Sequence, residues 1–185
     1  MLDSSIPNLR EDTLSSLIFK NAAVRGTKTA IREKDLGIWQ SWSWANVAEE
    51  VKLLAGGLAA KGYVRGKNLA IIGDNRPRLY WSFAASQSLG GVPVPLYQDA
   101  IADEMIYVFN DAEIEFAIVE DQEQVDKLLE IMPQCDKLRC IIYDDPRGMR
   151  HYDHPAVMAY EDVRELGSKI LNEQPNFIDD ELSKC

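Results

Sequence analysis

The chain has 185 residues and a net charge of −10, from 30 acidic and 20 basic side chains. Hydrophobic residues make up 46% of it and charged residues 27%, which excludes a disordered chain and allows one domain with a sizeable core. A sequence pI near 4.7 argues against a nucleic-acid-binding protein, since phosphate contacts need clustered Lys and Arg. Three cysteines are too few for a disulfide framework. We therefore expect a cytoplasmic protein, and the sequence leaves open a peripheral association with a membrane.

The first 66 residues predict a helix, a β-hairpin and a long helix, in that order. Apolar side chains between residues 14 and 22 recur with helical spacing. Two runs typical of strands, 29–34 and 38–42, flank a turn that contains Gly37. Ser43 is placed to cap the long helix, and Gly62 is placed to end it.

Residues 67–145 predict a parallel α/β core. Four short apolar runs begin 23, 24 and 24 residues apart, which is typical of strands buried on both faces: 69–73, 92–97, 116–119 and 140–143. Helical patterns separate the runs, the first from about residue 77 to 89 and the third capped by Asp121 and Gln124. The unit is therefore βαβαβαβ with right-handed crossovers and flanking helices.

A stretch of twenty uncharged residues, 79–98, has the length of a membrane span. Its second half contains Gly90, Gly91, Pro93 and Pro95, which break a helix. A buried helix followed by a buried strand explains the stretch better, so we expect no transmembrane span.

Residues 146–185 predict a loop, a helix over 161–171 and an irregular tail. The acidic charge concentrates upstream of them, because residues 99–130 hold eleven carboxylates and only one basic side chain, Lys127. We interpret this block as solvated helix faces, with a surface that repels anions or meets a basic partner as the alternative.

Motifs of common active sites are missing from the sequence. Residues 62–68 are one residue short of a nucleotide-binding phosphate loop and end in Asn68 instead of Ser or Thr. No G-x-G-x-x-G and no G-x-S-x-G occurs. His151 and His154 lie near Pro155 and Gly148, which favours surface positions in a loop over a metal site. We predict no catalytic and no metal-binding residue in this chain.

Ligands of open α/β sheets gather beyond the carboxyl ends of the strands. Those ends carry mostly acidic pairs here: 74–75, 98–99, 120–121 and 144–145. Arg76 and Arg78 are the exceptions. We favour their pairing with Asp74 or a surface role over contact with a phosphate or carboxylate from elsewhere in a larger protein.

Five segments in order carry a family resemblance: 30–34 with Trp39, Trp42 and Trp44; 73–81 (GDNRPRLYW); 90–97 (GGVPVPLY); 105–113 (MIYVFNDAE); and 119–129 (VEDQEQVDKLL). Over about residues 12–180 the chain resembles the N-terminal portion of the AMP-forming acyl-CoA synthetases, in their long-chain fatty-acid branch. The resemblance implies a ligase that makes an acyl-adenylate from ATP and a fatty acid, and then an acyl-CoA. ATP, Mg²⁺ and CoA are thus expected for the complete parent enzyme, together with the rest of its polypeptide.

The family's Ser/Thr/Gly-rich phosphate loop, adenine-binding segment, ribose-binding Asp and catalytic Lys have no counterpart in these 185 residues. We therefore expect an incomplete AMP-binding-type domain over 1–185, inactive alone and needing no cofactor of its own, with an open sheet edge that favours self-association. Asn75, Arg76 and Tyr97 match scaffold motifs of the family and are the candidate ligand-edge residues. The alternative function is a stand-alone, non-catalytic α/β binding or regulatory module.

Overall fold

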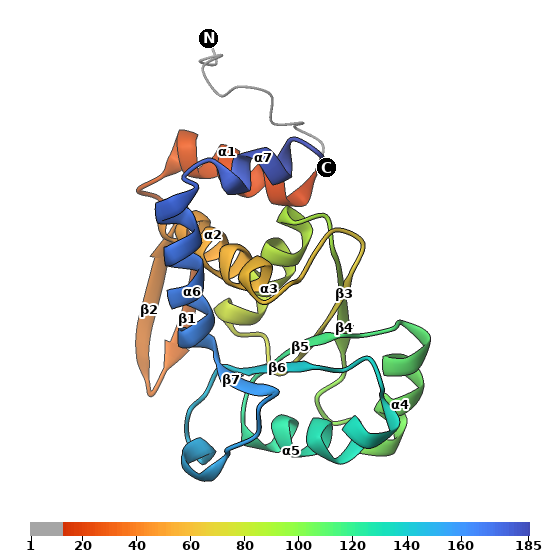
Figure 1. Cartoon of the computed structure of the whole chain (residues 1–185). Helices are drawn as coiled ribbons and strands as arrows, with labels where there is room; N and C mark the ends of the chain where they lie inside the picture. Colours follow the sequence, from red (N-terminus) through yellow and green to blue (C-terminus); the bar gives the residue numbers. More distant parts are fainter. Residues whose placement is uncertain (1–12) are drawn as a thin grey trace.

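The four apolar runs form one parallel sheet in the computed structural model, which describes residues 13–185. The strands alternate with helices as predicted: β3 (Asn68–Ile72), α3 (Pro77–Ser88), β4 (Val92–Leu96), α4 (Ala102–Asp111), β5 (Phe116–Val119), α5 (Gln122–Ile131) and β6 (Cys140–Tyr143). The spatial order of the sheet is β4-β3-β5-β6-β7. All four residues of β5 are buried, because helices cover both faces of the sheet (Figure 1).

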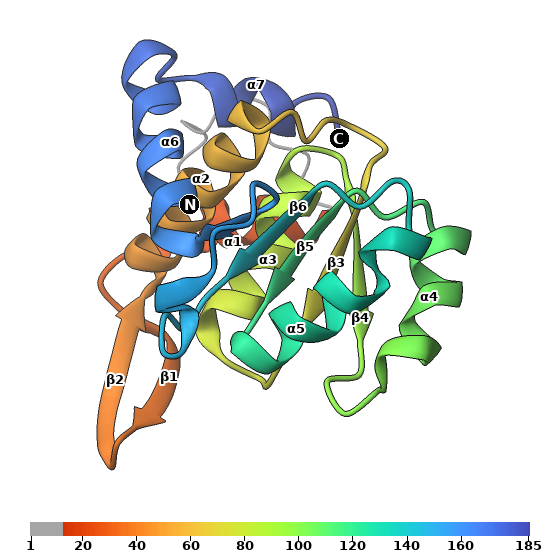
Figure 2. The same ribbon diagram turned by 60° about the horizontal axis from the view of Figure 1, so that its bottom comes forward.

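The lead-in also follows the prediction. It consists of α1 (Leu14–Arg25), β1 (Thr29–Asp35), β2 (Ile38–Ser43) and α2 (Trp44–Ala60). The Ser43 hydroxyl accepts from the Asn46 N–H, and the Asn46 side chain accepts from the Ser43 N–H, so a capping box fixes the start of α2. The antiparallel β1–β2 ribbon projects beyond the body of the molecule (Figure 2).

The prediction for residues 146–185 was wrong in two places. A short fifth strand, β7 (Val157–Ala159), pairs parallel with β6 where a loop was expected. The tail, expected to be irregular, contains α7 (Phe177–Leu182) after the predicted helix, which is α6 (Tyr160–Glu173). Three residues carry no periodicity, and only the neighbouring β6 makes them a strand. The α7 signal is also short, since its two buried side chains, Ile178 and Leu182, stand one turn apart in an acidic run.

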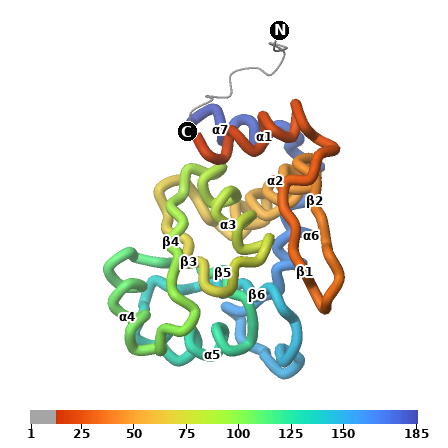
Figure 3. The backbone as a smooth tube through the Cα atoms, turned by 180° about the vertical axis from the view of Figure 1, so that it is seen from behind, coloured from red at the N-terminus to blue at the C-terminus, as the bar shows by residue number. Residues whose placement is uncertain are grey.

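Helices lie on both sides of the sheet (Figures 1 and 3), and the sheet separates two hydrophobic clusters. Side chains of α1, α2, α3, α6 and α7 pack on one face, against residues such as Ile71, Phe116 and Ile142. Helices α4 and α5 pack on the other, against Ile72 and Ile141. Neighbouring strand residues point to opposite faces, and each reaches a different layer. The continuous apolar runs in the sequence follow from this double burial.

The edge strand β4 is poor in hydrogen-bond donors. The Val92 N–H donates to the Lys67 carbonyl, on the β3 side. Groups alternate along a strand, so positions 93 and 95 face outward, and both are prolines without an N–H. The sheet does end in an open edge, but this edge presents carbonyl acceptors almost alone, which hinders pairing with another strand.

No helix in the described part of the chain is long and apolar enough to cross a membrane.

Candidate functional site

The residues after β3, β4 and β5 meet at the edge of the sheet where the carboxyl ends of the parallel strands lie. The Gln98 side chain donates from Nε2 to Oδ1 of Asp74 over 3.0 Å. The backbone N–H of Asp74 donates to Oε2 of Glu120 over 2.6 Å. Each residue stands within two positions of the end of a different strand, so the parallel register brings them within reach. The predicted polar edge therefore exists, and it is hydrogen-bonded internally.

Gly73 allows this close approach. Its φ is +151°, and a Cβ on it would lie 2.6 Å from Cβ of Glu120 and 2.9 Å from Cδ2 of Leu79. Real Cβ atoms essentially never come within 3.0 Å of another heavy atom. A glycine is thus required where β3 turns toward α3.

Arg76 connects the sheet edge to the projecting ribbon. Its Nε donates to Oε1 of Glu120 over 2.6 Å, and its guanidinium lies 3.3 Å from Oε1 of Glu33 in β1. Burial tends to lower the pKa of Arg76, but the hydrogen bond and charge of Glu120 outweigh it and raise that pKa. Arg76 precedes α3 without a side-chain cap bond, so its role at this helix start is ionic.

Neither Arg76 nor Arg78 forms an ion pair with Asp74 within residues 13–185, so the first of the two roles expected for them was wrong. Arg78 has other partners. It donates to Oδ1 of Asp144 over 2.8 Å and pairs with Glu161 of α6. It also stacks over the Tyr160 ring, 4.7 Å from the ring centroid. Burial raises the pKa of the Asp144 carboxyl, and Arg78 offsets that rise only in part. Arg78 reaches Asp144 because the end of β6 and the start of α3 lie close together in the fold. Local sequence does not reveal this proximity.

A cavity of about 310 Å³ opens beside this edge, between β3, α3 and β4. Its lining is part apolar and part polar and consists of these residues: Ile71, Gly73, Asp74, Asn75, Leu79, Tyr80, Phe83, Pro95, Leu96, Tyr97 and Gln98. Two candidate residues from the sequence, Asn75 and Tyr97, line this cavity together. Arg76 does not line it and faces Glu120 and Glu33 instead.

Two aromatic residues of α3 complete the wall, and sequence reasoning assigned them no role at this site. Tyr80 and Phe83 stack in a tilted arrangement with centroids 6.5 Å apart. The Tyr80 hydroxyl donates to Oδ1 of Asn75 over 3.2 Å. Tyr97 is 72% exposed, and a hydrogen bond to Asp99 raises the pKa of its phenol. The spacing of Tyr80 and Phe83 on one helix face was the available signal in the sequence, but such spacing is equally typical of core packing.

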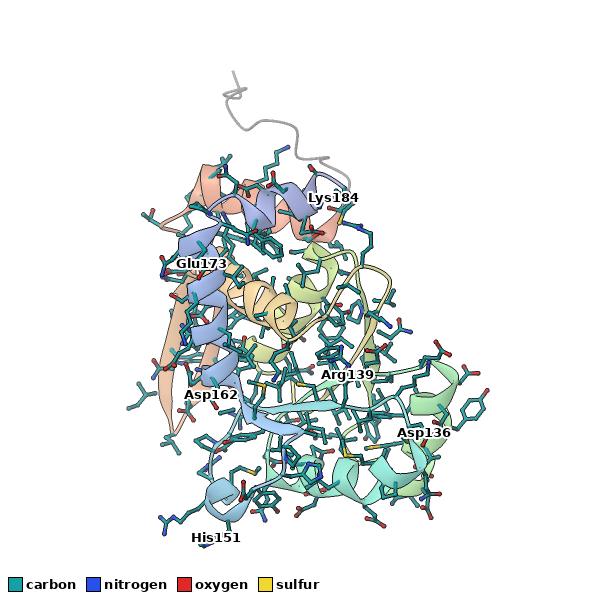
Figure 4. All side chains as sticks on the ribbon, viewed as in Figure 1. Asp136, Arg139, His151, Asp162, Glu173 and Lys184 are labelled. Atoms are coloured by element: carbon teal, nitrogen blue, oxygen red, sulfur yellow. The ribbon has the colours of Figure 1, made fainter. Side chains whose placement is uncertain are left out.

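Both arginines at this edge are paired with carboxylates, Arg76 with Glu120 and Glu33, and Arg78 with Asp144 and Glu161. Within residues 13–185, no three His, Cys, Asp or Glu side chains are grouped so as to hold a metal ion. His151 lies on the loop between β6 and β7, at the opposite end of the molecule from Lys184 (Figure 4). His154 is exposed in the same loop.

The sequence profile of the AMP-binding enzymes matches residues 18–177. The chain belongs to this family. Long-chain-fatty-acid–CoA ligase ACSBG2 of Xenopus laevis is 25% identical over 173 residues, which cover 93% of this chain and 23% of that protein. 4-hydroxybutyrate–CoA ligase 2 of Metallosphaera sedula is 30% identical over 151 residues, covering 77% of this chain and 25% of that ligase. This chain thus spans about a quarter of the length of these relatives.

Solved structures give the same fold. Acetoacetyl-CoA synthetase from Streptomyces lividans superposes with a TM-score of 0.72 at 19% identity, over 81% of this chain and 24% of that one. An anthranilate CoA ligase in complex with anthranoyl-AMP superposes with a TM-score of 0.69 at 18% identity, over 82% and 26%. At such low identity the likeness shows the α/β architecture alone.

Proposed function

We propose that this chain forms the N-terminal part of an ATP-dependent long-chain fatty-acid–CoA ligase. The proposal is carried by the family match over residues 18–177, together with the long-chain-fatty-acid–CoA ligases among the relatives. Such a ligase first joins the fatty acid to AMP and releases pyrophosphate. The CoA thiol then displaces AMP and forms the thioester. ATP, Mg²⁺, the fatty acid and CoA are the ligands of the complete enzyme, which we place in the cytoplasm.

The described residues support a binding role for this segment and leave the chemistry to the rest of the polypeptide. Apolar side chains such as Leu79, Phe83 and Pro95 line the cavity beside β4, together with the Asp74 carboxylate. This lining suits an uncharged part of a ligand and repels a phosphate or carboxylate. Asn75 and Tyr97 would form its wall, while Arg76 would hold the ribbon to the sheet edge. The family's phosphate loop and catalytic Lys have no counterpart in these 185 residues, so the chain alone should not turn over.

Intact-mass analysis of the native product, captured with an antibody against this segment, tests the proposal first. A product several times heavier than 20.9 kDa that forms acyl-CoA from palmitate, ATP and CoA would support it. A substrate series from four to twenty carbons then tests the long-chain assignment, because one relative is named for 4-hydroxybutyrate. The purified 185-residue chain is the matched control and should release no AMP.

Two outcomes would contradict the proposal. Thioester formation by the 185-residue chain itself would refute its inactivity. A native product near 21 kDa without ligase activity would instead favour the stand-alone binding module, and the cavity beside β4 would become its ligand site.

A further inference from the structure

The β1–β2 ribbon has one face turned to the body and one turned to solvent. Residues directly opposite in an antiparallel pair share a face, and the register pairs Arg32 with Ser41 and Lys34 with Trp39. All four of these residues are exposed, and Trp39 is 57% exposed. The residues that alternate with them include Glu33 and Trp42, which contact Arg76 and Trp81 of the body.

This outward face is cationic in an otherwise acidic chain. The Arg32 guanidinium lies over the Trp39 ring, 4.6 Å from the centroid. Within the described residues, neither Arg32 nor Lys34 forms an ion pair with a carboxylate. Two cations and an indole are therefore presented together, although the chain as a whole carries a net charge of −10.

The tip of the ribbon carries two exposed aliphatic side chains next to the exposed Asp35. Leu36 has a φ of +45° and is 90% exposed, and the neighbouring Ile38 is 65% exposed. The left-handed conformation disfavours a bulky side chain, and Asn or Gly would suit this turn better. The Leu36 side chain buries almost no surface in return. A strained and unburied leucine points to a contact outside the described residues.

We propose that the tip and outward face of the ribbon, formed by Leu36, Ile38, Trp39, Arg32 and Lys34, dock on an anionic lipid membrane. Exposed aliphatic side chains enter the boundary between headgroups and acyl chains, and an indole settles at that level. Arg and Lys beside them attract anionic headgroups. The ribbon projects from the body, so its tip can reach a flat surface before the acidic helices do (Figure 2). So small an anchor gives reversible binding.

Vesicle sedimentation with the full chain tests this surface. Vesicles of pure phosphatidylcholine are compared with vesicles that contain phosphatidylserine, at low and at high salt. We expect salt-sensitive binding to the phosphatidylserine vesicles only. R32Q/K34Q should weaken it about fivefold for each charge removed. L36N should weaken it about tenfold while keeping the turn, since Asn tolerates a positive φ.

Matched variants elsewhere on the surface serve as controls. Tyr107 on α4 is 73% exposed, so Y107S removes a comparable apolar side chain. K137Q/K169Q removes two exposed cations away from the ribbon. Both controls should bind vesicles like the unmodified chain. The proposal is overturned if the unmodified chain does not sediment with phosphatidylserine vesicles, or if L36N and R32Q/K34Q bind as well as the controls. Salt-sensitive binding to a single-stranded 20-mer of DNA without vesicle binding would also overturn it, and would assign the cations to nucleic acid.

Discussion

Helices α2 and α6 cross so closely that only glycine fits at the contact. A Cβ on Gly57 would lie 2.0 Å from the carbonyl oxygen of Val163, and a Cβ on Gly167 would lie 1.8 Å from that of Leu53. Ordinary van der Waals contact begins at 3.4 Å. Gly57→Ala therefore requires the two helix backbones to move apart by more than 1 Å, because a backbone carbonyl cannot rotate away as a side-chain end can.

The sign of the effect makes this substitution informative. At an unobstructed position inside a helix, Gly→Ala stabilises by about 1 kcal/mol. Here the helices must separate around Leu54, Leu58 and Val163, which are fully buried. Overpacking of this kind costs about 1–3 kcal/mol, and more when backbone atoms block the space. We expect Gly57→Ala to lower the free energy of unfolding by about 3 kcal/mol, or the melting temperature by roughly 6–12 °C.

Urea titration followed by far-UV circular dichroism measures the change. Gly56→Ala is the matched control, because its Cβ would lie 3.1 Å from Cα of Gly167 and needs only a small shift. The expected order of stability is unmodified chain or G56A first, and G57A and G167A last. A G57A variant as stable as the unmodified chain would refute the argument from the crossing.

Three further predictions follow from single residues. Burial raises the pKa of Tyr63 to about 12. The neutral phenol therefore contributes its full stability below pH 10, and this contribution is lost as the pH rises toward 12. The loss, about 3 kcal/mol, should shrink in Y63F when unfolding is measured across that range. Near pH 7, Y63F should lower the free energy of unfolding by about 1–2 kcal/mol, because the Tyr63 hydroxyl forms hydrogen bonds with Ser86 and the Lys67 carbonyl. Y160F should be neutral or stabilising, because the buried Tyr160 hydroxyl has no hydrogen-bond partner within residues 13–185. Equal losses for the two variants in chemical denaturation would contradict this prediction. Pro95→Val restores an outward N–H on β4 and should promote concentration-dependent self-association in sedimentation velocity, while an unchanged monomer would count against the protective role of the proline.

The candidate site was predictable in its position but not in its contacts. Parallel strands that end in polar residues place Asp74, Gln98 and Glu120 at one edge, and this follows from the order of elements. The partners of Arg76 and Arg78 depended instead on how the ribbon and α6 settle against the sheet. Glu33 lies 43 residues before Arg76 in the sequence, and no local pattern indicates their ion pair.

The sequence by itself determined the elements whose signals are local. The four apolar runs, the Ser43 and Asp121 caps and the turn at Gly37 depend on neighbouring residues, and each appears in the structure where it was expected. Tertiary structure alone decided β7, α7, the glycine contact of α2 with α6, and the cavity beside β4. These features arise because segments far apart in the chain pack together. In β7, for example, three residues without alternation become a strand only beside β6. Burial and pairing, unlike capping and periodicity, are properties of the assembled fold.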